Sequence, residues 1–174
     1  MMKAFSPERG LGMTKERYEA MIGYFRGPRQ RAWVFCFRNA PYLLAFMYAG
    51  LCLYAMFAAP AIAVRVIGVP AAVFVLATVL RAAINRPRPY DALGFKPLLP
   101  HKPGKGKSLP SRHAASAVVI ACALTYAWPP LGAVAIPLAA FVCCARVVTG
   151  MHYPSDVLCA AALALLCAWV GFGG

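Results

Sequence analysis

Five long apolar segments constrain the fold of this chain more than any other feature of its sequence. Each is nearly free of charged residues, and together they cover residues 40–64, 66–84, 114–128, 131–149 and 154–172. Most reach the roughly 17–25 residues that a helix needs to cross a bilayer. The segment 114–128 reaches that length only if its helix begins near Ser111. The sequence therefore predicts an all-α, polytopic membrane bundle of about five transmembrane helices.

The charged residues are few, and they are strongly basic. The 174 residues include 18 lysines and arginines against only 5 aspartates and glutamates, and 61% of the chain is hydrophobic. After Glu19 the only carboxylates are Asp91 and Asp156, which excludes the paired-carboxylate chemistry of glycosidases and carboxylate-rich metal cages. The seven cysteines contain no C-x-x-C pair, so we interpret them as small hydrophobic residues rather than zinc ligands or disulfides.

The first 39 residues are predicted to be a basic N-terminal segment, followed by a transmembrane domain over residues 40–174. This segment holds 8 basic and 3 acidic residues and has no apolar stretch long enough for a signal-peptide core. Behind Thr14, apolar residues recur at helical spacing, at Tyr18, Met21, Ile22 and Phe25. The dipeptide Gly27-Pro28 ends this pattern, which predicts a short amphipathic helix that lies in the membrane interface.

Residues 85–110 are predicted to be a loop by their turn chemistry, and they belong to the most basic stretch of the chain. Between Arg81 and Arg112 there are 8 basic residues and one acidic residue, Asp91, so this stretch requires an anionic partner. Nucleic acid is disfavoured, because the stretch has few interleaved aromatic residues and is held between two membrane spans. We therefore expect a phosphorylated membrane lipid or a small phosphate as the partner, in contact with the bilayer.

Three short polar clusters interrupt the apolar sequence. The first runs from Arg81 to Pro89 at the end of the second span, the second from Pro110 to His113 at the start of the third, and the last from Arg146 to Asp156 between the fourth and fifth. With five spans, all three clusters fall on the same side of the membrane. This topology permits one shared site.

The clusters contain the residue types that phosphoryl transfer needs. Arginine offers a fixed fork of donors that matches phosphate oxygens, and a serine at a helix start adds a hydroxyl beside backbone amides that point at an anion. Five residues form a candidate phosphate cradle on these grounds: Arg81, Arg88, Ser111, Arg112 and Arg146.

Two of the three histidines lie in the same clusters. Asp156 follows His152 by four residues, so on a helical turn its carboxylate can accept a proton from one imidazole nitrogen and leave the other as a nucleophile or base. His113 comes from a different span and is a candidate general acid for a leaving oxygen. His101 is expected to be an exposed loop residue.

The order and spacing of these motifs resemble those of a known family. Three motifs are similar to the three-part signature of the type 2 phosphatidic acid phosphatase and vanadium haloperoxidase superfamily: Arg81-x6-Arg88-Pro89, Pro110-Ser111-Arg112-His113 and Arg146-x5-His152-x3-Asp156. The match covers residues 81–156 and departs from the family pattern at three positions. Arg81 stands in place of the usual lysine, Arg112 in place of a glycine, and Ala145 in place of a serine.

The resemblance implies a small integral-membrane lipid phosphatase that works through a phosphohistidine and needs no metal or other cofactor. It makes His152 the nucleophile, Asp156 its orienting partner and His113 the acid for the leaving group, and it assigns phosphate binding to the five cradle residues. The implied substrate is a lipid phosphate or an isoprenyl phosphate or diphosphate, such as undecaprenyl diphosphate. Two alternatives stay open: a vanadate-dependent haloperoxidase-like enzyme and a catalytically silent lipid-binding membrane protein.

Two arguments predict opposite membrane faces for the site. With five spans, the amino terminus and the site share one side, which holds 8 basic residues in the first 39, 8 more between Arg81 and Arg112, and Arg146. Only Arg65 lies near the other side. The positive-inside rule then favours the cytoplasmic face, whereas the family resemblance favours the outer face. The oligomeric state stays open.

Overall fold

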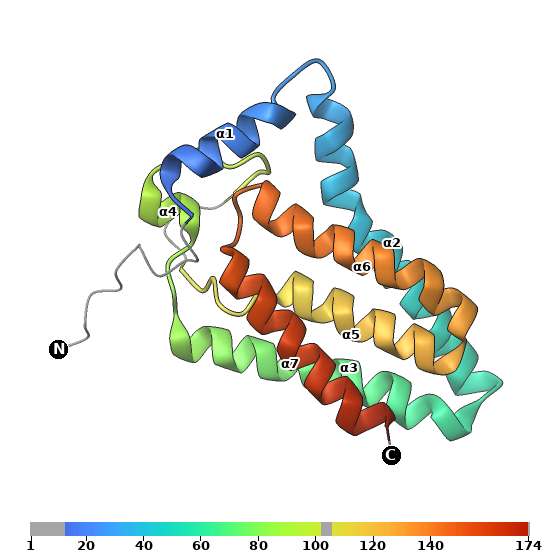
Figure 1. Ribbon diagram of the computed structural model, residues 1–174. Coiled ribbons are helices and arrows are strands. Elements are labelled where there is room, and N and C mark those ends of the chain that lie inside the picture. The colour runs from blue at the N-terminus through green and yellow to red at the C-terminus, as the bar shows by residue number, and fades with distance from the viewer. Residues whose placement is uncertain (1–12, 102–105, 174) are drawn as a thin grey trace.

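The chain folds into helices that lie side by side along most of their length (Figure 1). The computed structural model describes residues 13–101 and 106–173, and within these ranges it contains helices but no strands. In chain order the helices are α1 (Lys15–Phe25), α2 (Gln30–Phe57), α3 (Pro60–Ile84), α4 (Pro89–Leu93), α5 (Arg112–Ala127), α6 (Pro129–Val148) and α7 (Pro154–Phe172). The prediction of an all-α membrane bundle is therefore confirmed.

Four helices are long and apolar enough to cross a membrane, namely α2, α3, α6 and α7. α5 is also apolar but has only 16 residues. Its N-cap is Ser111, so the helix begins where the length of the third span required it to begin. The polar start of α5 thus lies at the same end of the bundle as the charged loops.

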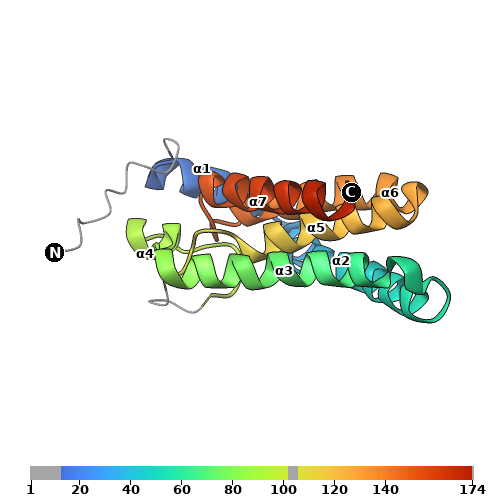
Figure 2. The same ribbon diagram turned by 90° about the horizontal axis from the view of Figure 1, so that it is seen from below.

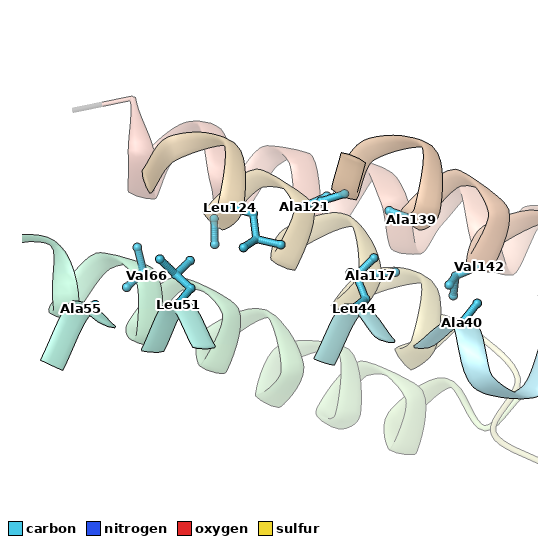
Figure 3. Close-up of a cluster of buried hydrophobic side chains, with 12 residues drawn as sticks. Ala40, Leu44, Leu51, Ala55, Val66, Ala117, Ala121, Leu124, Ala139 and Val142 are labelled. Carbon is cyan, nitrogen blue, oxygen red and sulfur yellow. The ribbon is translucent and has the colours of Figure 1, made fainter. Parts of the chain in front are cut away.

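α5 is the central helix of the bundle. It packs against α2, α3, α6 and α7, and Figure 2 shows α6 and α7 on one side of it and α2 and α3 on the other. Alanines on α5 let the neighbouring helices approach closely, as small residues do at helix interfaces in membranes. Figure 3 shows this at Ala117 and Ala121, which meet Leu44 of α2 and Ala139 of α6 in one buried cluster.

The predicted boundary between the first two spans is wrong. We predicted spans over 40–64 and 66–84, divided at Arg65, but α2 begins at Gln30 and the break falls just before Pro60. Proline is well suited to the first helical turn, where its missing N–H leaves no bond unmade. Arg65 is accommodated inside α3, because it is exposed near the bundle end and its Nη1 donates to Tyr126 Oη at 3.3 Å.

The N-terminal helix forms as predicted, but part of its apolar side is covered by protein. Thr14 caps α1 by accepting a hydrogen bond from the backbone N–H of Arg17 at 3.4 Å. Tyr18 and Ile22 are fully buried, in a cluster with Phe95 and other residues of the loop before α5. α1 therefore covers the loop end of the bundle, and its predicted contact with the membrane interface stays a prediction. The predicted boundary between the N-terminal segment and the transmembrane domain, at residues 39 and 40, lies inside α2, which runs through it without a break.

Candidate active site

The three polar clusters lie together at one end of the bundle, where α3 and α6 end and α5 and α7 begin (Figure 1). Backbone hydrogen bonds connect them directly. The N–H of Ser108 donates to the carbonyl of Arg86 at 2.8 Å, and the N–H of Ser111 donates to the carbonyl of Asp156 at 3.1 Å. Backbone contacts alone thus hold together segments that are far apart in the sequence.

The loop between α6 and α7 brings His152 to the start of α7. It turns at Gly150, whose φ of +75° is in the region that favours glycine. A Cβ atom at this position would also lie 2.7 Å from the ring of Phe95. Tyr18 of α1 holds the same loop from outside, since its hydroxyl donates to the backbone carbonyl of His152 at 3.2 Å.

His152 and Asp156 form a buried pair. His152 Nδ1 lies 3.4 Å from Asp156 Oδ2, and the backbone N–H of Tyr153 donates to the same carboxylate oxygen at 3.0 Å. With Nδ1 facing the carboxylate, Nε2 is the ring nitrogen left for a substrate. Burial lowers the pKa of His152, and Asp156 partly opposes this shift. The imidazole is therefore neutral near pH 7, as a nitrogen nucleophile must be.

Arg86 and Ser108 complete the environment of Asp156, and neither was among the site residues predicted from the sequence. Arg86 Nη1 lies 2.8 Å from Asp156 Oδ1, with both side chains almost fully buried (4% and 0% exposed). The Arg86 guanidinium also lies 4.0 Å from the centre of the Tyr153 ring. Ser108 Oγ donates to Asp156 Oδ2 and lies 3.4 Å from His152 Nδ1. Both carboxylate oxygens are thus held by charge or hydrogen bonds.

The arginines of the predicted cradle converge from separate elements. Arg81 at the end of α3 is buried and interacts electrostatically with Arg88 and Arg112. Arg146 at the end of α6 is buried and interacts electrostatically with Arg88. Like charges repel one another, so an anion bound among these arginines would stabilise the arrangement. Arg112 also lies against α3, with its guanidinium 5.7 Å from the centre of the Phe74 ring.

Two buried donors of the cradle are left without a partner. Among the described residues, neither Ser111 Oγ nor Arg146 Nε makes a hydrogen bond. Buried polar groups are normally satisfied, and phosphate oxygens would satisfy both. His113 is exposed in the first turn of α5 and interacts electrostatically with Arg146, His152, Arg112 and Arg81. The structure therefore brings all eight predicted site residues to one region.

His101 differs from its prediction. It was expected to be exposed, but it is half-buried, and its ring lies 4.8 Å from that of Tyr90. Tyr90 is itself buried and follows the last proline of the first motif, so the aromatic contact explains the burial. The seven cysteines are free. Within the described ranges, no three His, Cys, Asp or Glu side chains are grouped as metal ligands.

Comparisons with known proteins identify the family. Residues 61–173 match the sequence profile of the PAP2 superfamily, whereas no curated protein is significantly similar to the chain. The crystal structure of LpxE from Aquifex aeolicus has the same fold, with a TM-score of 0.73 over 92% of this chain and 95% of that chain at 23% identity. The PAP2 type phosphatidylglycerolphosphate phosphatase from Bacillus subtilis is 25% identical, with a TM-score of 0.48 over 90% of each chain.

Proposed function

Since this chain belongs to the PAP2 superfamily, we propose that it is an integral-membrane phosphatase that hydrolyses a lipid phosphate or an isoprenyl phosphate or diphosphate without a metal ion. One observation carries this proposal. A neutral, buried histidine, His152, is oriented by the fully buried carboxylate of Asp156 at the edge of a cluster of arginines. A nucleophile with an orienting base partner beside a phosphate cradle is the arrangement that covalent phosphoryl transfer requires.

The reaction proceeds in two displacements. His113 is protonated when the anionic phosphate is bound, because the negative charge of the substrate stabilises the imidazolium. His152 Nε2 attacks the phosphorus and forms a P–N bond, the bond to the leaving oxygen breaks, and the His113 imidazolium gives that oxygen its proton. Asp156 stabilises the positive charge that develops on the imidazole. Water then attacks the phosphorus, gives its proton to His113 and releases inorganic phosphate, which restores both histidines.

The cradle stabilises the charge on the three equatorial phosphate oxygens during both steps. Arg146 Nε and Ser111 Oγ supply unpartnered donors from the buried side. Arg112, which stands where the family has glycine, contacts the phosphate from the side of α3, because its guanidinium lies against Phe74 and interacts electrostatically with Arg81 and His113. A lipid substrate reaches such a site from the bilayer, since Phe74 is exposed on a membrane-spanning helix.

Phosphate release should persist in the presence of a chelator and be inhibited by orthovanadate, which imitates five-coordinate phosphorus. The reason is that arginines and histidines, rather than a metal ion, stabilise the transferring group. The measurement is phosphate release by purified protein in detergent from lipid phosphates and isoprenyl diphosphates, with and without EDTA or vanadate. Strict dependence on added Mg²⁺ would contradict the mechanism.

Halide oxidation with bound vanadate would indicate a haloperoxidase, and vanadate binding without turnover would indicate a silent lipid-binding protein.

We propose that the site faces the cytoplasm. α1 contacts the loop between α6 and α7 through Tyr18, so the basic residues of α1 lie on the same side as the site, opposite Arg65. In a cysteine-free background, Lys96→Cys marks the site end and Ala58→Cys marks the opposite end, and both positions are exposed. An impermeant thiol reagent applied to intact cells should label position 58 and spare position 96. Labelling of position 96 without permeabilisation would assign the site to the outer face.

A further inference from the structure

A proline in α2 leaves one backbone carbonyl of that helix without its usual donor. Pro41 lies inside α2 and has no N–H, so the carbonyl of Phe37, four residues earlier, cannot accept the helical hydrogen bond. Arg146 Nη2 donates to this oxygen at 2.9 Å, in a buried environment. A cradle arginine thus binds the one carbonyl in this turn of α2 that the proline has made available.

The surroundings of this bond hold it in place. The ring of Phe37 stacks on Phe141 of α6 with 5.6 Å between ring centres, and on Trp33 at 5.8 Å. Phe141 precedes Arg146 on the same helix, so α2 and α6 are fixed against each other at this point. With one N–H anchored, the movement of the Arg146 guanidinium is restricted, and its buried Nε has no hydrogen-bond partner among the described residues.

The same chain contains a second example that has no part in the site. Pro70 lies inside α3 and leaves the carbonyl of Val66 without its helical donor. Tyr48 Oη donates to that oxygen at 2.9 Å, next to the hydrophobic core. The two prolines therefore have the same local chemistry, and only Pro41 is connected to a cradle residue.

We propose that Pro41 is a positioning residue for phosphate binding: it keeps the Phe37 carbonyl open as the acceptor that orients Arg146. This inference rests on the proposed function and extends the site to α2, which precedes the residues that match the family profile. Replacement by alanine returns an N–H to the helix. The carbonyl then bonds within α2 and turns back along the helix axis, away from α6.

The test compares Pro41→Ala with Pro70→Ala as the matched control. Equilibrium binding of orthovanadate is measured by calorimetry, because it reports the cradle without turnover, and kcat, KM and the thermal midpoint are measured beside it. Pro41→Ala should weaken vanadate binding and raise KM by roughly tenfold, the loss expected for one hydrogen bond to a charged group. Its thermal midpoint should not fall, since alanine favours a helix. Pro70→Ala should leave vanadate binding and KM unchanged.

A double-variant cycle shows whether the effect passes through Arg146. In an Arg146→Lys background, Pro41→Ala should have little further effect, because lysine lacks the planar fork that the carbonyl orients. The proposal would be overturned if the losses of vanadate affinity were additive in the double variant, or if Pro41→Ala and Pro70→Ala lost the same affinity. It would also be overturned if Pro41→Ala bound vanadate as the wild type does, or if the wild-type protein bound no vanadate. Vanadate binding without lipid phosphate hydrolysis would refute the proposed function and still decide the role of Pro41. If Pro41→Ala does not fold, Pro41→Leu returns the same N–H and serves in its place.

Discussion

Replacement of His152 by alanine should abolish phosphate release from every substrate, with a loss of at least roughly 10³-fold in kcat. The proposed nucleophile would take part in the first displacement whatever group leaves, so no choice of substrate could compensate for its absence. The side chain is buried in the loop before α7, and the variant should be checked for a folded helical spectrum. The measurement is initial rate on a lipid phosphate and on an activated aryl phosphate.

Two other histidine variants serve as comparisons. His101→Ala removes the histidine that contacts Tyr90 rather than the cradle, and it should retain wild-type activity. His113→Ala should reduce release of a basic alkoxide far more than release of an aryl oxide, because a general acid matters less as the leaving oxygen becomes less basic. Equal and mild losses for His113→Ala and His152→Ala would show that the two roles are assigned wrongly.

Replacement of Arg86 by methionine should be the most destabilising substitution at the site. Arg86 is paired with Asp156 at 2.8 Å where both are almost inaccessible, and removal of one partner leaves an uncompensated buried charge. Such losses cost about 3–5 kcal/mol. The thermal midpoint in detergent should therefore fall strongly, and activity should fall with it because Asp156 no longer holds His152 in position.

A control and a double variant separate this effect from loss of a surface charge. Arg38→Met removes an exposed arginine of α2 and should change stability little. Arg86→Met combined with Asp156→Leu removes both charges, so it should recover much of the stability but none of the activity. A thermal midpoint for Arg86→Met equal to that of the wild type would mean that the ion pair does not form.

Several features of the molecule follow from local properties of the sequence. The length of an apolar run decides whether it can cross a bilayer, so the runs that became α6 and α7 were predicted within two residues of their observed ends. A helix cap requires only a suitable side chain beside the first turn, which is why Thr14 predicted the start of α1. The motif residues were found for a similar reason, since the spacing of His152 and Asp156 is a property of one helical turn.

Other features depend on contacts between distant segments, and the sequence could not supply them. Spacing along the chain predicted only His152 as a partner of Asp156, and no local pattern assigned a cation to its carboxylate. The partner is Arg86, 70 residues away, and the signal available was that a carboxylate in so apolar a chain needs a cation. The break at Pro60 was missed because Arg65 was taken as a membrane boundary, whereas Arg65 lies inside α3, where it is exposed and hydrogen-bonded to Tyr126 of α5.

The sequence by itself determined which residues are polar, how they are spaced and how long each apolar run is, because these quantities concern neighbours along the chain. Only the tertiary structure decided that Arg86 and Ser108 hold Asp156, that Tyr18 holds the loop between α6 and α7, and that α2 supplies an acceptor to Arg146. Each of these contacts joins segments at least 44 residues apart. Their existence depends on how the helices pack, and packing reflects the combined burial of many side chains rather than any local pattern.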